Sequence, residues 1–141
     1  MMHSILKLTI RLSFLVLIVL ITASCGNSDT PQPSPFVLTE SDSGSKVALK
    51  QGQIISVSLK SNPSTGYAWA IVPGSELYLS QQGASEFVSD NSNIPGAGGV
   101  LTFKFMAIAS GDCTLKLIYR QPWMTDVAPA KTFEVAITVG S

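Results

Sequence analysis

The sequence predicts an all-β fold, a two-sheet antiparallel β-sandwich of seven or eight strands. Short runs that alternate apolar and polar residues favour half-buried strands over helices. Segments rich in Gly and Pro separate these runs, as turns between strands would. Beyond residue 35, no stretch repeats apolar residues at the spacing of a helix face. Without helices to cover it, one sheet must bury its apolar face against another sheet.

The first 24 residues have the pattern of an export signal. Lys7 and Arg11 supply positive charge, residues 12–21 are apolar apart from one Ser, and small residues follow. The apolar run is shorter than the roughly 20 residues that span a membrane. Cys25 comes next, in a pattern similar to the lipobox of bacterial lipoproteins. We therefore expect acylation of Cys25. The alternative is ordinary cleavage nearby, which gives a soluble secreted protein.

A short tether follows the signal. It is polar and contains three prolines, so it cannot bury a core and should be extended.

The lipobox match is imperfect, because Thr22 stands where Leu is usual. The predicted organisation is a signal over residues 1–24, a lipidated Cys and tether over 25–35, and one domain over 36–141. We expect a protein anchored by lipid in the bacterial cell envelope, or otherwise a secreted or periplasmic one.

Charge and composition argue against several classes of function. Lys7 and Arg11 are two of nine basic residues, so the rest of the chain has seven basic and nine acidic residues, a net charge of −2. The chain has no basic patch or run of charges, so we expect no nucleic-acid partner. The only histidine, His3, lies in the signal, which excludes Ser-His-Asp and Cys-His catalysis and His-based zinc sites in the mature chain. A carboxylate pair assembled by folding stays open. We expect no enzyme, cofactor or metal.

The expected strands follow one another through the domain. In residues 54–60, for example, Ile55, Val57 and Leu59 alternate with polar residues. Each large aromatic core residue buries on the order of 150–250 Å2. The expected aromatic core residues are Trp69, Phe103, Phe105 and Phe133. The predicted runs are Phe36–Thr39, Lys46–Leu49, Ile54–Lys60, Tyr67–Val72, Leu77–Gln81, Glu86–Asp90, Val100–Ala109, Cys113–Arg120 and Thr132–Val139.

The second cysteine falls within one of these runs. Cys113 alternates in phase with Leu115, Leu117 and Tyr119, so we expect it to face the core as a small apolar residue. The alternative is a disulfide with Cys25, which requires that Cys25 is not acylated.

Dense turn chemistry marks the loop from Asn62 to Gly66. Pro63 fixes its own φ angle and Gly66 can take a positive one, which leaves Ser64 and Thr65 near the apex. A loop that is stiff before binding loses less entropy when a partner binds it. The alternative is a hairpin turn with a purely structural role.

Two further loops should emerge at the same end of the sandwich, since alternate loops of this architecture do so. Three glycines, Gly96, Gly98 and Gly99, allow backbone to approach a partner closely, although a flexible connection would also use them. The third loop carries Trp123 beside a proline and outside any strand alternation. An exposed Trp there would be an interface anchor. Alternatively, it folds back as a lid over the core.

These three loops resemble those of the chagasin family of cysteine-protease inhibitors. The family carries Asn-Pro-x-Thr-Gly-Tyr/Phe in its first binding loop, Gly-x-Gly-Gly in the second and Arg-Pro-Trp in the third. All three occur here in the same order over roughly residues 36–139. Gln121 stands where Arg is usual, with Arg120 one position earlier. The matching segments are Asn62-Pro63-Ser64-Thr65-Gly66-Tyr67, Gly96-Ala97-Gly98-Gly99 and Gln121-Pro122-Trp123.

The resemblance implies an immunoglobulin-like sandwich whose loops form a wedge that plugs the active-site cleft of papain-like cysteine proteases. The apex from Pro63 to Gly66 would lie at the catalytic centre, with Thr65 closest. Gly98 and Gly99 would run along the non-primed side, and Trp123 would pack on the primed side. The residues implied to bind the protease are Asn62, Pro63, Ser64, Thr65, Gly66, Tyr67, Gly96, Gly98, Gly99, Arg120, Gln121, Pro122 and Trp123.

Three functions therefore compete. The first is a reversible inhibitor of papain-like cysteine proteases, for which a monomer suffices. The second is a non-inhibitory, envelope-anchored module that binds a peptide or glycan with the same loops, favoured by the departure at Gln121. The third is a hydrolase, which the missing histidine opposes.

Overall fold

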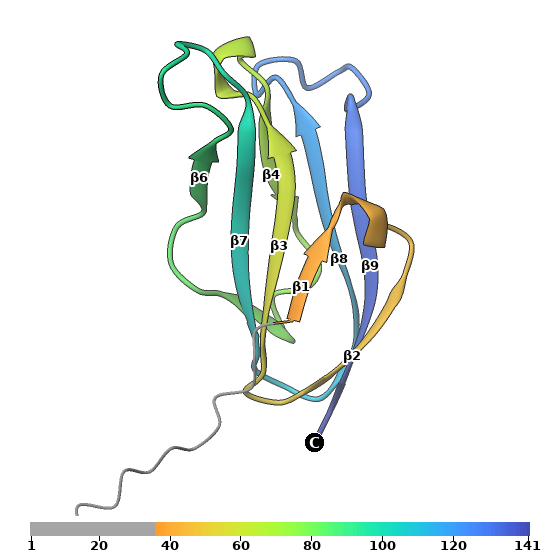
Figure 1. The fold of residues 1–141 in the computed structure, drawn as a ribbon. Coiled ribbons are helices and arrows are strands. Elements are labelled where there is room, and N and C mark those ends of the chain that lie inside the picture. Colours follow the sequence, from red (N-terminus) through yellow and green to blue (C-terminus); the bar gives the residue numbers. More distant parts are fainter. Residues whose placement is uncertain (1–35) are drawn as a thin grey trace, which may run out of the picture. The chain divides into compact units, whose positions relative to one another are not determined.

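The computed structural model describes residues 36–141. The expected export signal, the tether and Cys25 lie outside the described residues. Residues 36–141 form nine strands and two short 3-10 helices (Figure 1). The elements are β1 (Phe36–Thr39), η1 (Glu40–Asp42), β2 (Lys46–Lys50), β3 (Ile54–Ser61), η2 (Pro63–Thr65), β4 (Ala68–Val72), β5 (Leu79–Gln81), β6 (Glu86–Ser89), β7 (Gly99–Ala107), β8 (Gly111–Arg120) and β9 (Lys131–Gly140).

The strands of this described part form two sheets, which confirms the predicted sandwich. One sheet has five strands in the order β1-β3-β7-β5, with β6 also paired to β7. The other has four strands in the order β2-β9-β8-β4. The strand count exceeds the expected seven or eight, and two pairings are parallel: β1 with β3, and β2 with β9. Alternation shows which residues face the core, but it does not encode the direction of a strand's partner.

The alternating apolar residues pack between the two sheets. Phe103 and Phe105 stack with their ring centroids 6.4 Å apart, and Phe133 is almost fully buried. Trp69 is also buried, and its indole N–H donates a 2.9 Å hydrogen bond to the Lys60 carbonyl. This bond satisfies the polar end of a side chain that is otherwise apolar. The four expected aromatic core residues are thus confirmed.

Two of the predicted runs extended two residues beyond the strands that form, one at its start and one at its end. Leu77 is exposed and lies in a turn before β5, which is closed by a 3.0 Å bond from the Tyr78 N–H to the Ser75 carbonyl. Ile108 is also exposed and follows the end of β7. In both places an apolar residue next to a strand imitates the strand pattern, although the chain has already turned.

Cys113 lies on β8 and packs half-buried against the core cluster, in line with its phase. Burial raises the pKa of its thiol, and the nearby Asp112 carboxylate raises it further. Because its pKa is raised, the Cys113 thiol is protonated and weakly reactive at neutral pH. The alternative disulfide partner, Cys25, lies outside the described residues.

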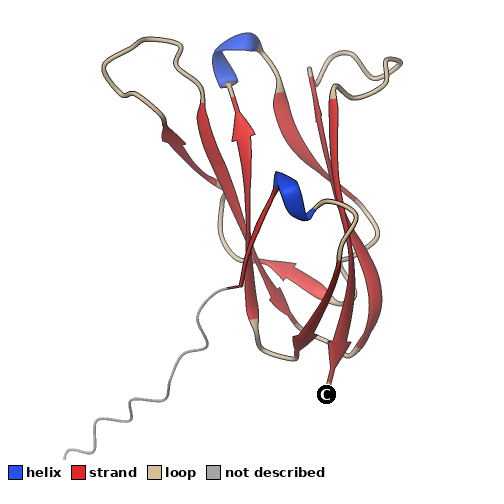
Figure 2. Ribbon diagram, turned by 45° about the vertical axis from the view of Figure 1, so that its right-hand side comes forward, coloured by secondary structure: helices blue, strands red, loops and turns tan. Residues whose placement is uncertain are grey.

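The loops that matter for function gather at one end of the sandwich. The connections β3–β4, β6–β7 and β8–β9 lie together at the top of Figure 1, and the C-terminus lies at the opposite end. The view of Figure 2 shows the same grouping. Within residues 36–141 no helix has the length and apolar character needed to cross a membrane.

Candidate functional site

Three loops build the candidate site, and each joins strands of the sandwich. The first loop, residues 62–67, connects β3 to β4 and contains η2. The second loop, residues 90–98, connects β6 to β7, and the third loop, residues 121–130, connects β8 to β9. Hydrogen bonds join the first loop to both of the others, so the first loop is the centre of the site.

The first loop is closed by its own side chains. The Asn62 side-chain oxygen accepts bonds from the Ser64 N–H at 3.1 Å and the Ser64 hydroxyl at 2.6 Å. The Thr65 hydroxyl donates to the Asn62 carbonyl at 2.6 Å. Gly66 has φ +77°, the left-handed region expected for it, and its N–H bonds to the Pro63 carbonyl at 3.1 Å. The predicted turn is confirmed, and several of its polar groups are satisfied within the loop.

A cluster of three aromatic side chains supports the first loop on its core side. The Asn62 N–H donates a 2.9 Å bond to the hydroxyl of Tyr119. The ring of Tyr119 lies beside the rings of Tyr67 and Trp69, with centroids 5.4 Å and 5.1 Å away. Tyr67 is half-buried in this contact. Its place in the motif is therefore explained by support of the loop.

The second loop meets the first through one carbonyl. The Gly96 carbonyl accepts bonds from the Ser64 hydroxyl at 3.1 Å and the Asn62 side-chain amide at 3.3 Å. Gly96 also has a positive φ, +77°, which favours glycine at this turn. A Cβ on Gly98 would be in ordinary contact, 3.5 Å from the Ser61 carbonyl oxygen. The structure thus brings Gly96 and Gly98 next to Asn62 and Ser64.

Gly99 does not belong to the exposed part of the second loop. It begins β7 and is buried, and a Cβ there would overlap the Val88 carbonyl oxygen and the Phe87 ring. Its missing side chain lets β6 pair closely with β7, where Ser89 lies opposite Gly99. Strand pairing therefore gives a structural reason for the glycine at this position, and the expected contact of Gly99 backbone with a protease stays a prediction.

The third loop packs on the first through Trp123 and Gln121. The Trp123 side chain is 68% exposed, yet its ring covers Gly66: a Cβ on Gly66 would lie 2.7 Å from the Cη2 atom of Trp123. The Gln121 side-chain amide donates a 3.3 Å bond to the Thr65 carbonyl. Trp123 is therefore exposed in its loop, as predicted, and the alternative of a lid over the core is wrong. Pro122, between the two, is also exposed.

Arg120 lies apart from these contacts. It is the last residue of β8, opposite Ala68, and its guanidinium donates a 3.4 Å bond to the Thr125 carbonyl of the third loop. Gln121, not Arg120, touches the apex of the first loop. The two neighbouring residues are therefore not interchangeable.

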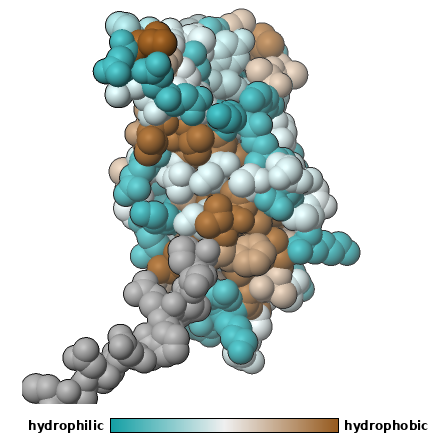
Figure 3. Space-filling model, viewed as in Figure 1, coloured by the Kyte–Doolittle hydropathy of each residue, from teal (hydrophilic) through white to brown (hydrophobic). Residues whose placement is uncertain are grey.

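Sequence reasoning missed three exposed apolar residues near these loops. Ile94 in the second loop is 57% exposed, and Met124 and Val127 in the third loop are 40% and 53% exposed. Figure 3 shows separate hydrophobic patches at this end of the molecule among hydrophilic surface. The available signal was an apolar residue inside a Gly- and Pro-rich loop, outside any strand alternation.

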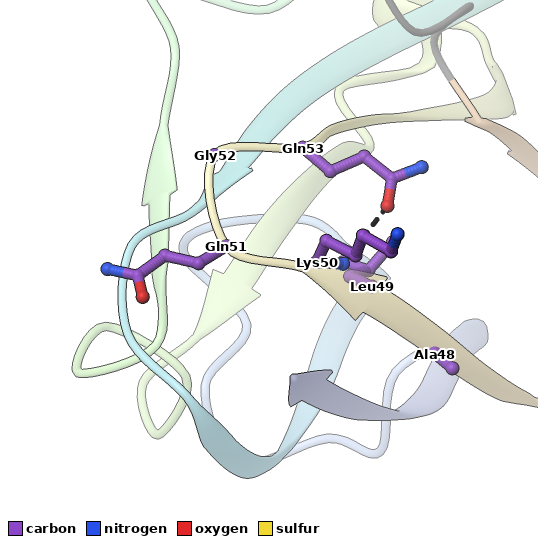
Figure 4. Close-up of a pocket in the computed structure, with 6 residues that line it drawn as sticks. All are labelled: Ala48, Leu49, Lys50, Gln51, Gly52 and Gln53. Carbon is purple, nitrogen blue, oxygen red and sulfur yellow. Dashed lines mark hydrogen bonds between the residues drawn. The ribbon is translucent and has the colours of Figure 1, made fainter. Parts of the chain in front are cut away.

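A cavity of about 670 Å3 lies away from the loops, at the turn between β2 and β3, lined by residues 48–53 (Figure 4). Its only internal side-chain bond joins the Lys50 N–H to the Gln53 side-chain oxygen, at 3.1 Å. One Lys and two Gln supply its polar groups. Residues 36–141 also contain no cluster of three or more His, Cys, Asp or Glu that could hold a metal. The loop end, not this cavity, therefore concentrates the candidate residues.

Comparison with known proteins identifies the family to which the chain belongs. Residues 48–137, more than half of the chain, match the model of the "Chagasin family peptidase inhibitor I42". The chain is 29% identical over 104 residues to Amoebiasin-1 of Entamoeba histolytica, covering 72% of this chain and 97% of that protein. It is 28% identical over 104 residues to Chagasin of Trypanosoma cruzi, covering 70% and 92%.

A solved structure extends the comparison to the fold. The crystal structure of the cysteine protease inhibitor EhICP2 from Entamoeba histolytica superposes with a TM-score of 0.67 at 23% identity, covering 74% of this chain and 95% of that one. At that identity the likeness concerns the fold, and the family follows from the match over residues 48–137. The chain belongs to the chagasin family of peptidase inhibitors.

Proposed function

We propose that this protein is a reversible inhibitor of papain-like cysteine proteases that fills the active-site cleft with its three loops. The family is one of inhibitors rather than enzymes. The observation that carries the proposal is the set of bonds that lock the three loops together. Gly96 and Ser64 join the second loop to the first, and Gln121 and Thr65 join the third. A surface assembled before binding loses little entropy in the complex, which is compatible with tight inhibition.

The apex is suited to blocking a protease rather than being cut by one. A scissile peptide must be extended to enter the catalytic centre, whereas Pro63 to Thr65 form a 3-10 turn. The Gly66 N–H is bonded to the Pro63 carbonyl and the Thr65 N–H to the Asn62 carbonyl, at 3.1 and 3.2 Å. Extension of this turn would break both bonds and the cap from Asn62. The wedge therefore supplies no chemistry and acts by denying access.

The departure at Gln121 does not favour the alternative of a non-inhibitory binding module. Gln121 donates to Thr65 within the loop cluster, so the residue has a role that is consistent with an assembled wedge. The side chains of Asn62 and Thr65 are likewise engaged within the first loop rather than left free for a peptide or glycan.

The proposal includes a lipid anchor and a location in the bacterial envelope. Its support is the sequence pattern of residues 1–24, Cys25 directly after them, and the Pro-rich tether that reaches the domain at residue 36. Metabolic labelling with a fatty-acid analogue tests it: label should enter the wild-type chain and be lost in Cys25→Ser. Labelling that persists in that variant would refute acylation at Cys25.

Inhibition itself is tested by titrating papain with the full-length chain, using a fluorogenic peptide substrate. We expect one-to-one, reversible loss of activity at nanomolar inhibitor. Full papain activity at micromolar concentrations of a chain with a folded β spectrum would contradict the proposal if other papain-like proteases also stayed active.

A further inference from the structure

The outer part of the three loops is uncharged, although the second and third loops each contain one aspartate, Asp90 and Asp126. We define the tip as residues 62–67, 91–98 and 121–125. None of these residues is Asp, Glu, Lys or Arg. The third of these segments contains Gln121 at the position where the family motif has Arg, so this chain lacks the one charge that the motif would place there.

Polar side chains of the tip are directed at other parts of the tip. Asn62 bonds to Ser64 and Gly96, and the Thr65 hydroxyl bonds to the Asn62 carbonyl. The Gln121 amide donates to the Thr65 carbonyl. What a partner meets is therefore backbone, apolar side chains and short neutral polar side chains, among them those of residues 91–93. The exposed apolar residues of the tip are Pro63, Ile94, Pro95, Pro122, Trp123 and Met124.

The nearest charges lie beside the tip, with equal numbers of positive and negative groups. Lys60 pairs with Asp90 at 3.4 Å, and Lys131 pairs with Glu40 at 3.2 Å. Arg120 and Asp126 lie at the base and within the third loop, with opposite signs. Exposed pairs of this kind stabilise the fold little, and the three positive and three negative charges beside the tip sum to zero net charge.

We infer that the tip selects its targets by shape and apolar contact, and that its association with a protease is not steered by charge. The inference rests on the proposed function and deepens it. The fitting partner is a protease cleft whose subsites are apolar and uncharged. The overall charge of that protease should matter little, because the inhibitor offers no charge for it to attract or repel at the point of contact.

The association rate constant measured against ionic strength tests this directly. The full-length chain is mixed by stopped flow with papain, and with a papain-like protease whose cleft is acidic. Salt is varied from about 0.01 M to about 1 M, where the screening length falls from about 30 Å to about 3 Å. We expect the rate constant to change less than about threefold for both enzymes, whereas steered associations fall by about 10-fold to 1,000-fold.

Variants at one position separate charge from loop packing. Gln121→Arg adds a positive charge to the tip. The association rate constant of this variant with the acidic enzyme should fall about tenfold as the salt concentration rises. Gln121→Met removes the bond to Thr65 without adding charge, so it should speed dissociation and leave association independent of salt. Thr114→Arg is the matched control: it adds the same charge to an exposed site on β8, six residues or about 20 Å from Arg120. It should behave as the wild type.

The outcomes distinguish the two proposals. A wild-type rate constant that falls tenfold or more with salt, or that rises for one enzyme and falls for the other, would overturn the inference while leaving inhibition intact. The absence of inhibition for any papain-like protease would overturn the proposed function itself.

Discussion

The first and second loops use similar residues but are held in different ways. The first is closed by side chains, since Asn62 bonds to Ser64 and Thr65 bonds back to Asn62. The second closes mainly on its backbone, through bonds of 3.2 Å from the Ile94 N–H to the Asn91 carbonyl and 3.1 Å from the Ala97 N–H to the Ile94 carbonyl. Each loop thus contains hydrogen bonds of its own.

Their attachment to the rest of the molecule differs more. The first loop is supported from below by Tyr119 and covered on one side by Trp123. The second touches the first mainly through the Gly96 carbonyl. The first loop therefore determines the shape of the wedge, and the second takes its position from it. Substitutions should have larger effects at the first loop than at the second.

The largest effect is expected for Gly66→Ala, which disturbs the first and third loops together. A Cβ at this position would lie 2.7 Å from a ring atom of Trp123 and would also occupy a left-handed conformation, φ +77°. The indole must move away from the apex. We expect inhibition to weaken by about 3 kcal/mol, in the range of interface hot spots. The inhibition constant against papain measures it.

Gly52→Ala is the matched control. Gly52 also has a positive φ, +85°, but a Cβ there would meet nothing within 4 Å, and its turn lies at the other end of the sandwich. Both variants should lose about 1 kcal/mol of folding free energy from backbone strain, and only Gly66→Ala should lose inhibition. Equal inhibition constants for the two variants would show that the contact with Trp123 is unimportant.

Trp123→Ala should come next, weakening inhibition by about 2 kcal/mol. The side chain is 68% exposed, so its removal should change the free energy of unfolding by no more than about 0.5 kcal/mol. The inhibition constant and a urea unfolding curve together test this. Leu77→Ala, at another exposed apolar residue away from the loops, should change neither. A folded Trp123→Ala variant with unchanged inhibition would remove Trp123 as the anchor.

Tyr119→Phe tests the support beneath the first loop. It removes the hydroxyl that accepts the Asn62 N–H at 2.9 Å and leaves that donor without its partner. We expect a loss of about 1.5 kcal/mol in the free energy of unfolding, the order of a lost hydrogen bond that leaves a buried group unpaired. Tyr78→Phe removes a hydroxyl for which the structure shows no such role, and serves as the control. Equal stability losses in the two variants would argue against support of the loop by Tyr119.

Much of this arrangement could be predicted from the sequence, because it depends on local chemistry. Alternation placed Phe103 and Phe133 in the core, and Pro63 with Gly66 predicted the stiff turn. The contacts between loops could not be predicted in the same way. Gln121 and Thr65 are 56 residues apart in the sequence, and no local pattern encodes their bond.

The role of Gly99 was hidden for a similar reason. In the sequence it continues the glycines of the second loop, but in the structure it starts β7 and is needed by the neighbouring strand β6. In the sequence, a glycine needed by a loop cannot be told from one needed for the close pairing of two strands until the pairing is known. The parallel pairings of β1 with β3 and of β2 with β9 were not predicted, because local sequence does not show the direction of a strand's partner.

The smallest effect is expected at the second loop, for Ile94→Ala. Ile94 is 57% exposed and makes the main apolar contribution of that loop, so its truncation should cost about 1 kcal/mol of binding, roughly the transfer of one or two methylene groups. Val37→Ala, at a 55% exposed residue on β1 away from the loops, is the control and should leave inhibition unchanged. The comparison between the loops depends on the order of these values. If Ile94→Ala weakened inhibition more than Gly66→Ala, the second loop rather than the first would determine how the wedge binds.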